Sequence, residues 1–103
     1  MSEINLFEPA APEALIPLGF SFARFLGPAA SIASVKSVLI ATWRGTDLTP
    51  ADRLYNAAQI DGQRVVQWIR YPVLGVTYKI QAIIIASDGR EWPCTALLPV
   101  REA

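Results

Sequence analysis

Residues 75–86 read Gly-Val-Thr-Tyr-Lys-Ile-Gln-Ala-Ile-Ile-Ile-Ala, and this stretch decides the fold class. Side chains of a β-strand alternate between its two faces, so the pattern separates two sets of residues. The set expected in the core is Tyr78, Ile80, Ala82 and Ile84, and the opposite set is Thr77, Lys79, Gln81, Ile83 and Ile85. The sequence therefore predicts a long strand with one fully apolar face.

The first half of this stretch, Gly75 to Ile80, resembles the tyrosine corner of immunoglobulin-like sandwiches. In such domains a Tyr near the start of a late strand has its ring in the core and its hydroxyl bonded to nearby backbone. Tyr78 stands at that position, and Ile80 stands where antibody-type domains have a Cys. The resemblance is thus to disulfide-free relatives, and it implies an all-β fold, an immunoglobulin-like antiparallel β-sandwich.

Two Asp-Gly pairs separate strand-like runs and predict β-hairpins. Asp61 and Gly62 follow Leu54 to Ile60, and Asp88 and Gly89 follow Val76 to Ser87. Asp-Gly favours two-residue turns of type I′, which fix the register of the flanking strands. For the second hairpin this register places Ile85 opposite Trp92 and Ile83 opposite Cys94, with Ile80 opposite Leu97 and Ala82 opposite Thr95 on the other face.

This register creates an apolar patch of Ile83, Ile85, Trp92 and Cys94 on the face turned away from the core. Monomeric proteins rarely expose large apolar patches, so the patch predicts a protein interface. The alternative is that the N-terminal segment or the loop from Gly45 folds over it. Pro93 and Pro99 favour an edge position for the last strand, because Pro cannot donate to a ladder.

Residues 1–14 are expected to form an extended N-terminal arm, and residues 15–103 the sandwich domain. The arm has Pro9 and Pro12 and a short apolar cluster of Ile4, Leu6 and Phe7, which either docks on a neighbouring subunit or is a frayed terminus. The domain is expected to begin with a strand from Ile16 to Leu26. A long alternating strand from Ser31 to Arg44 follows, with Val35, Leu39 and Trp43 on one face, and residues 51–58 form a helical turn or a short strand.

The composition limits the classes of function. The 103 residues suffice for one domain, and nine basic and nine acidic residues balance, so the basic surface typical of nucleic-acid binders is missing. Only 17% of residues are charged, which predicts that partners cover part of the surface. Cys94 is the only cysteine, which excludes an internal disulfide. No basic region followed by an apolar stretch opens the sequence, and no apolar run is long enough to span a membrane, so we expect no export by a signal peptide and no membrane partner.

Residues typical of catalytic and metal sites are scarce. The sequence has no His, which removes the commonest general base and metal ligand. Asp47, Asp52, Asp61 and Asp88 fall in expected turns, where Asp is favoured for local backbone hydrogen bonds. We therefore expect no enzyme, no cofactor and no metal site. We expect the three Trp residues to be anchors in the core or in an interface. In the alternative hypothesis of a carbohydrate-binding module, Trp43, Trp68 or Tyr71 would be an exposed ring on which a sugar stacks.

The order of motifs resembles small immunoglobulin-like virion proteins of tailed bacteriophages, over most of residues 16–100. The resemblance is carried by Ile32-Ala33-Ser34, Gly45-Thr46-Asp47, the Ile60 to Gln67 segment with Gly62, the step from Gly75 to Tyr78, and Ser87-Asp88-Gly89. In the Ile60 to Gln67 segment, Gln67 is displaced slightly from the position of Gln in the family pattern. The family supplies no catalytic residues to carry over.

The resemblance implies a non-enzymatic structural component of the virion, made in the host bacterial cytoplasm. It is expected to contact other virion proteins and copies of itself at the neck, tail or baseplate. The alternatives are a capsid decoration protein, a carbohydrate-binding or host-adhesion module, and a cellular β-sandwich interaction module unrelated to phages.

Overall fold

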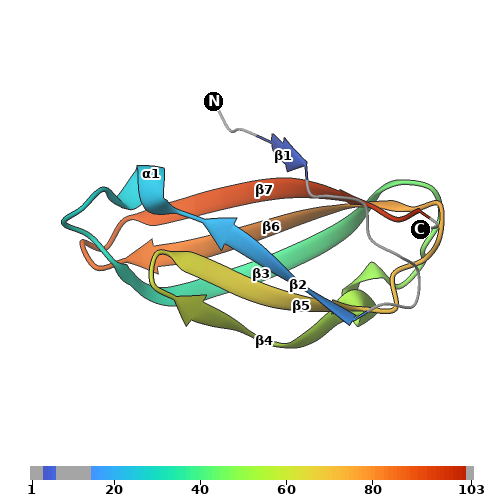
Figure 1. Cartoon of the computed structure of the whole chain (residues 1–103), viewed down its shortest axis with the longest axis horizontal. Coiled ribbons are helices and arrows are strands. Elements are labelled where there is room, and N and C mark those ends of the chain that lie inside the picture. The colour runs from blue at the N-terminus through green and yellow to red at the C-terminus, as the bar shows by residue number, and fades with distance from the viewer. Residues whose placement is uncertain (1–3, 7–14, 102–103) are drawn as a thin grey trace.

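The computed structural model describes residues 4–6 and 15–101, and there the chain is a β-sandwich (Figure 1). The prediction of an all-β sandwich is confirmed. The elements are β1 (Ile4–Leu6), β2 (Leu15–Ser21), α1 (Ala23–Leu26), β3 (Ile32–Arg44), the 3-10 turn η1 (Pro50–Arg53), β4 (Leu54–Asp61), β5 (Arg64–Arg70), β6 (Thr77–Ala86) and β7 (Glu91–Pro99).

Two sheets enclose the core. One has the order β1-β7-β6-β3, with β1 parallel to β7 and the other neighbours antiparallel, and the second is antiparallel with the order β2-β5-β4. The predicted core face of β6 is confirmed, because Tyr78, Ile80, Ala82 and Ile84 are each 0% exposed. Phe20 and Ile69 of the second sheet are also buried in the same cluster.

The first long strand ends earlier than predicted. β2 stops at Ser21, and residues 23–26 form a helical turn closed by hydrogen bonds from the Phe25 and Leu26 N–H groups to the Phe22 carbonyl. Continued alternation would have placed Arg24 on the same face as Phe20 and Phe22. The helical turn instead leaves Arg24 exposed while Phe22 and Leu26 are buried, so core burial explains the change.

The β6–β7 hairpin has a three-residue loop, and the predicted two-residue turn at Asp88-Gly89 is wrong. The Ala86 N–H donates to the Arg90 carbonyl at 2.7 Å, and only Gly89 in the loop has positive φ, at 86°. This is the pattern of a type I turn with a bulge at Gly. Ser87 forms hydrogen bonds with Ser31 and not with β7. The Ser87 N–H donates to the Ser31 carbonyl at 2.8 Å, and the Ser31 N–H donates to Ser87 Oγ at 3.0 Å.

The changed loop shifts the register by one residue and divides the predicted patch. Ala82 pairs with Cys94 and Ile84 pairs with Trp92, so these two β7 residues lie on the core side of the sheet. Cys94 is 5% exposed, and the Trp92 ring stacks on Phe25 with centroids 5.1 Å apart. Ile83 and Ile85 remain on the outer face, half-buried, opposite Pro93 and Glu91. The predicted patch of Ile83, Ile85, Trp92 and Cys94 is therefore not one surface.

The β4–β5 hairpin also turns one residue later than Asp61-Gly62 predicts. Asp61 pairs with Arg64, and the two central residues are Gly62, with φ of 61°, and Gln63. Positive φ at the first central position alone fits a type II′ turn rather than type I′. Gln63 is held from outside the hairpin, since its side-chain amide donates to the Gly27 carbonyl at 2.7 Å and its carbonyl accepts from the Phe22 N–H at 2.9 Å.

β3 does not keep the single alternation predicted for residues 31–44. Its register against β6 shifts between Ile32 and Ser34 and again between Val35 and Ser37. After these bulges Val38 and Ile40 point to the core, while Leu39, predicted to share a face with Val35, lies on the outer side and is 56% exposed. A bulge inserts one residue and so exchanges the two faces of the strand.

The last strand is not an edge along its whole length. β1 pairs with Thr95 to Leu97 of β7, between Pro93 and Pro99. Ile4 and Leu6, predicted in an arm, thus lie in a strand that pairs with the same chain, and Phe7 lies outside the described residues. Proline lacks the N–H needed for pairing, which explains why the covered stretch lies between the two prolines.

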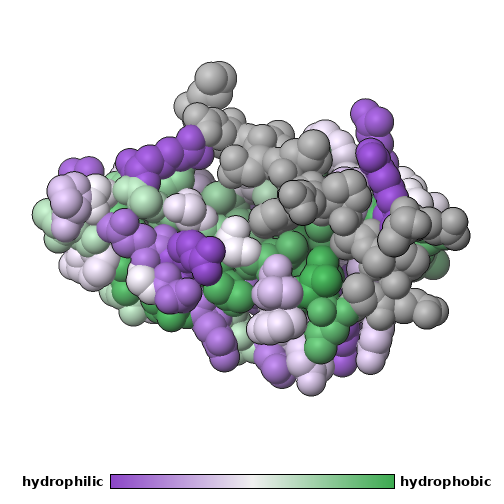
Figure 2. Space-filling view, in the orientation of Figure 1, coloured by the Kyte–Doolittle hydropathy of each residue, from purple (hydrophilic) through white to green (hydrophobic). Residues whose placement is uncertain are grey.

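The surface is apolar in several places. In Figure 2, green apolar residues reach the surface of the face toward the viewer, between purple hydrophilic ones. Leu15 of β2, for example, is 49% exposed. Among the described residues no helix has the length and apolar character to cross a membrane.

Candidate binding surface

Two loops meet at the end of the sandwich that also carries the C-terminus (Figure 1). They are the β3–β4 connection, with residues 45–53, and the β5–β6 connection, with residues 71–76. A Cβ built on Gly45 would lie 2.8 Å from the Gly75 carbonyl oxygen, so the two loops are in direct contact. The Gly75 N–H donates to the Val100 carbonyl at 3.1 Å, which ties the second loop to the end of β7.

Tyr78 joins both loops from below. Its ring is fully buried, and its hydroxyl donates to Asp47 Oδ2 at 2.6 Å and accepts from the Val73 N–H at 3.1 Å. The buried hydroxyl therefore has both a donor and an acceptor partner, as buried polar groups require. Burial, followed by the hydrogen bond to Asp47, raises the pKa of Tyr78 to about 12, so the hydroxyl keeps the proton that it donates.

Asp47 connects the first loop to the network. Its Oδ1 accepts from the Thr49 N–H at 3.0 Å, and its carbonyl accepts from Thr42 Oγ1 at 3.1 Å. Burial alone would raise the pKa of Asp47. The hydrogen bonds from Tyr78 and Thr49, with the nearby charge of Arg53, outweigh this effect and hold the pKa below its ordinary value.

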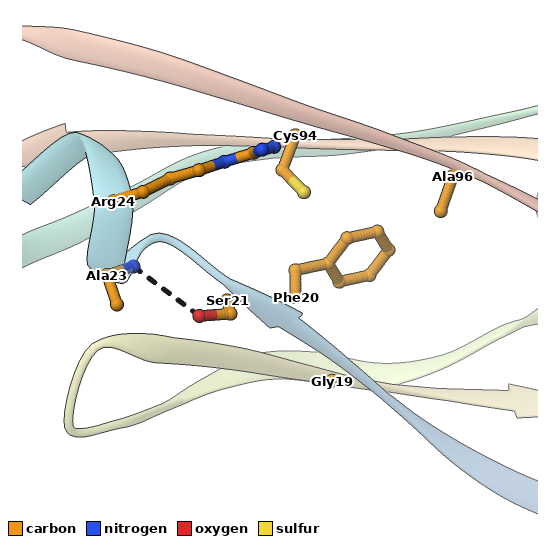
Figure 3. Close-up of a pocket in the computed structure, with 7 residues that line it drawn as sticks. All are labelled: Gly19, Phe20, Ser21, Ala23, Arg24, Cys94 and Ala96. Carbon is orange, nitrogen blue, oxygen red and sulfur yellow. Dashed lines mark hydrogen bonds between the residues drawn. The ribbon is translucent and has the colours of Figure 1, made fainter. Parts of the chain in front are cut away.

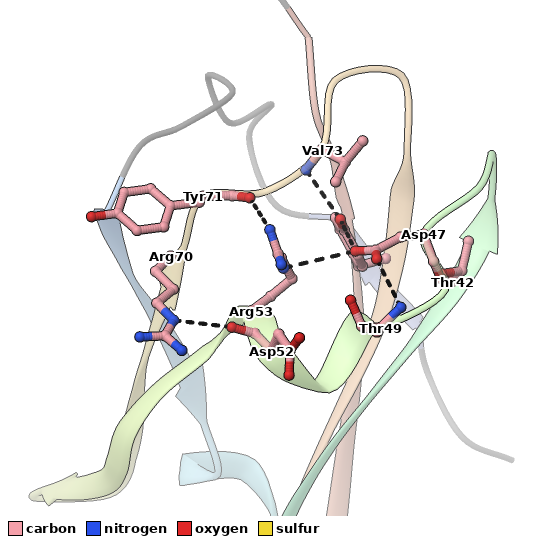
Figure 4. A network of polar contacts seen from close by, with 9 residues as sticks. Thr42, Asp47, Thr49, Asp52, Arg53, Arg70, Tyr71 and Val73 are labelled. Carbon is pink, nitrogen blue, oxygen red and sulfur yellow. Dashed lines mark hydrogen bonds and ion pairs between the residues drawn. The ribbon is translucent and has the colours of Figure 1, made fainter.

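Arg53 of η1 lies between the two loops (Figure 4). Its Nη1 donates to the Tyr71 carbonyl, and its Nε is 3.8 Å from Asp47 Oδ2. Nε is buried and has no hydrogen-bond partner within the described ranges, so it interacts with Asp47 through charge. A second arginine, Arg70, donates from Nε to the Asp52 carbonyl at 3.1 Å and fixes η1 to β5.

The network holds Tyr71 in an unusual conformation. Its φ is 49°, in the left-handed region that residues other than Gly rarely adopt. The hydrogen bond from Arg53 to the Tyr71 carbonyl supports this backbone, and Pro72 next to it is fully buried. The Tyr71 side chain is directed outward and is 59% exposed.

Four apolar side chains protrude from this supported end, and we call them the end patch. They are Leu48 at 91% exposed, Tyr71 at 59%, Leu74 at 48% and Val73 at 37%. They stand on two loops that contact each other, and exposed apolar groups on adjoining segments are typical of protein contacts. The loops beneath them are fixed by side-chain hydrogen bonds, so the end patch is an ordered surface that a partner can bind with little loss of chain entropy.

Most of the end patch was not identified from the sequence. Tyr71 was considered there only as a sugar platform, while Leu48, Val73 and Leu74 were not selected. A signal exists in each loop, since Leu48 stands between Asp47 and Thr49, and Val73 and Leu74 stand between the turn-forming residues Pro72 and Gly75. Loops are generally polar and exposed, so an aliphatic residue at a loop tip indicates a contact.

A hollow of about 360 Å³ lies at the open side of the sandwich between β2 and β7 (Figure 3). Its lining includes the Phe20 ring, the Cys94 side chain, Ala96 and Arg24. Among the described residues no group of His, Cys, Asp or Glu side chains is arranged to hold a metal ion. The lining is mainly apolar, with the polar side chains of Ser21 and Arg24 and the Cys94 thiol at its border.

No protein-family model matches the chain, no curated protein is a significant relative of it, and no solved structure matches it. A function must therefore be inferred from its own residues. The end patch combines exposed apolar groups with a fixed backbone, and the charged groups of Asp47 and Arg53 are turned inward to support the loops. Such a surface is suited to binding another protein.

Proposed function

We propose that the protein is a non-enzymatic bacteriophage virion structural protein that assembles in several copies at the neck, tail or baseplate. The end patch is the observation that carries this proposal. A component inserted between other subunits needs an apolar contact surface that is ordered before assembly, and Leu48, Tyr71 and Leu74 provide one. Its partners are other virion proteins and further copies of the same chain.

An immunoglobulin-like topology is the fold we propose for the sandwich. In that fold strands B, E and D share one sheet and C, F and G the other, with a conserved Tyr near the start of F. The order β2-β5-β4 corresponds to B-E-D, and β3-β6-β7 to C-F-G. Tyr78 is the second residue of β6, and its hydroxyl is bonded to the backbone five residues upstream, which supports the assignment of a tyrosine corner.

The N-terminal arm has a place in this proposal. β1 is held to β7 through three residue pairs, from Ile4 with Thr95 to Leu6 with Leu97. The same pairing can form with β7 of a neighbouring copy, since both arrangements use identical contacts. Exchange of residues 1–14 between copies would then link subunits in the assembled particle.

The electrostatic balance supports protein partners over nucleic acid. Nine basic and nine acidic residues leave a net charge of zero, whereas binding to a phosphate backbone depends on an excess of Lys and Arg. Several of the arginines are also engaged within the chain, including Arg53 of η1 and Arg70 of β5. The charges are therefore used to support the fold and not to form a basic surface.

Quantitative mass spectrometry of tailed-phage particles purified from the source of the gene tests this proposal. We expect the chain in intact particles, at a small copy number relative to the major shell protein. A copy number comparable with that protein would assign the chain to capsid decoration instead. Absence from intact particles would refute the virion role.

Host adhesion through glycans is a second candidate function, and the exposed ring of Tyr71 favours it. Aromatic rings commonly stack on sugars, and Tyr71 is 59% exposed on a fixed loop. Trp43 is less suitable, since Lys79 Nζ lies 5.4 Å from its ring centroid and occupies that face. A glycan array compares the chain with its Tyr71→Ala variant, and binding at millimolar glycan that this substitution abolishes would favour adhesion.

A further inference from the structure

The edge strands of the two sheets are β1, β2, β3 and β4, and three of them are poorly suited to pairing with another chain. β1 is only three residues long, and it covers β7 along Thr95 to Leu97. β2 contains Pro17, which has no N–H to donate, and β4 is interrupted by a register irregularity that includes Asn56 with φ of 62°. Prolines, bulges and covering strands are the usual devices that prevent edge-to-edge association.

β3 is the unprotected strand. Within the described residues it pairs only with β6, and its other side lies at the edge of the sheet. From Ser37 to Thr42 the pairing is regular, and the stretch reads Ser-Val-Leu-Ile-Ala-Thr, with neither a charged residue nor Pro. A regular, uncharged edge strand of high β-propensity is a template for another strand.

The surroundings of β3 leave room for such a strand. A hollow of about 310 Å³ separates β3 from β4 and includes Val38 and Ala58 in its lining, and another of about 210 Å³ lies beside Leu39 and Ala41 on the outer face. Val38 and Ile40 point to the core but are only half-buried. An additional strand beside β3 would cover these side chains on both faces of the sheet.

We propose that β3 pairs antiparallel with β3 of a second copy, with Leu39 opposite Leu39 at the two-fold axis. Residues that face each other across a pair must point to the same face of the sheet. In the regular stretch Leu39 and Ala41 point outward and Val38 and Ile40 inward, so the axis must pass through a residue. An axis at Leu39 pairs Val38 with Ile40 and Ser37 with Ala41, which joins the two sheets without exposing a core side chain.

Charge selects this axis over its neighbour. Lys36 and Arg44 lie at the irregularities that bound the regular stretch, so an axis one residue later, at Ile40, would bring Lys36 of one copy close to Arg44 of the other. Like charges near each other destabilise a strand pair. With the axis at Leu39, Lys36 lies closer to Thr42 than to Arg44. Its ammonium group is already paired with Glu91 of β7 in the same chain. The chain has no net charge, so two copies do not repel each other as they approach.

Disulfide capture tests this pairing. The Cα atoms of directly opposed residues in an antiparallel pair are about 4.5 to 5.5 Å apart, within the span of a disulfide. A Leu39→Cys chain, oxidised under mild conditions, should form a covalent dimer on non-reducing gels. The control is Leu15→Cys, because Leu15 of β2 is similarly exposed, at 49% against 56%, and lies outside both β3 and the end patch. The unsubstituted chain, with buried Cys94, gives the background.

A larger dimer fraction for Leu39→Cys than for Leu15→Cys supports the pairing, and an equal or smaller fraction overturns it. Sedimentation velocity gives an independent test, because Leu39→Lys should shift the chain to monomer while Leu15→Lys should not. A dimer that persists in Leu39→Lys, or a monomer in the unsubstituted chain at every concentration, also overturns the proposal. This inference rests on the self-association that the proposed function includes. The disulfide and sedimentation experiments do not depend on the copy number in phage particles, so each proposal can fail while the other stands.

Discussion

The two ends of the sandwich use glycines of nearly identical backbone conformation for different purposes. Gly45, at the end that carries the end patch, has φ of 85°, and Gly89, in the β6–β7 turn at the opposite end, has φ of 86°. A Cβ at Gly45 would meet the Gly75 carbonyl oxygen at 2.8 Å, whereas a Cβ at Gly89 would have nothing within 4 Å. The turn end thus depends on local conformation, while the patch end also depends on contact between loops.

Gly45→Ala should cause the largest loss of stability. The substitution adds the strain of a left-handed Ala to a backbone clash, which together cost about 2 to 5 kcal/mol of unfolding free energy. Gly89→Ala carries the conformational strain alone and should cost about 1 to 2 kcal/mol. Urea unfolding of both variants measures the difference, and equal losses would show that the contact between the loops contributes nothing.

Tyr78→Phe should follow, with a loss of about 1 to 3 kcal/mol, because it removes the hydroxyl that joins Asp47 to Val73 and leaves buried groups without a partner. Tyr55→Phe is the matched control, since Tyr55 is 36% exposed, and it should change stability by no more than about 0.5 kcal/mol. Thermal and urea unfolding measure both. A change below a few tenths of a kcal/mol at Tyr78 would count against the tyrosine corner.

Acid should weaken the patch end specifically. The pKa of Asp47 is lowered in the folded state, so the unfolded state binds the proton more tightly as pH falls. The stabilisation by Asp47 is present above its unfolded pKa of 3.8 and is lost as pH falls from there through the lower folded pKa. Asp47→Asn should reduce stability at neutral pH and flatten this acid-dependent loss. An unchanged slope between pH 5 and the acid limit would contradict the assignment.

Leu48→Ser should have the smallest effect on folding and a selective effect on assembly. Leu48 is 91% exposed, so stability should change by less than about 0.5 kcal/mol. If the end patch binds another virion protein, fewer copies of this variant should enter particles, as measured by quantitative mass spectrometry. Arg90→Ser, at the exposed turn end, is the control and should be incorporated normally. Equal incorporation of both variants would exclude Leu48 from the contact.

The sequence was sufficient for the local features of the fold. Strand alternation identified the core face of β6, and Asp-Gly pairs identified the two hairpins. The registers were wrong because residues distant in sequence decide the turns. Ser31 binds Ser87, and the carbonyl of Gly27 holds Gln63, so each turn is displaced by a tertiary contact that local propensity cannot express.

The candidate surface was harder to predict for a related reason. Asp47 and Tyr78 were each singled out from the sequence, but their hydrogen bond spans 31 positions of the chain. Leu48 and Leu74 lie in the two loops that this bond and the ion pair of Asp47 with Arg53 help to hold. A one-residue error in the β7 register was enough to move Trp92 and Cys94 from the predicted interface to the core.

The pairing of β1 with β7 has a consequence for how the chain folds as it is synthesised. Ile4 pairs with Thr95, so β1 can find its partner only after β7 has left the ribosome. Until then β1 has no strand with which to pair. Because this pair joins segments far apart in the sequence, folding should be limited by long-range closure, on the order of milliseconds to seconds.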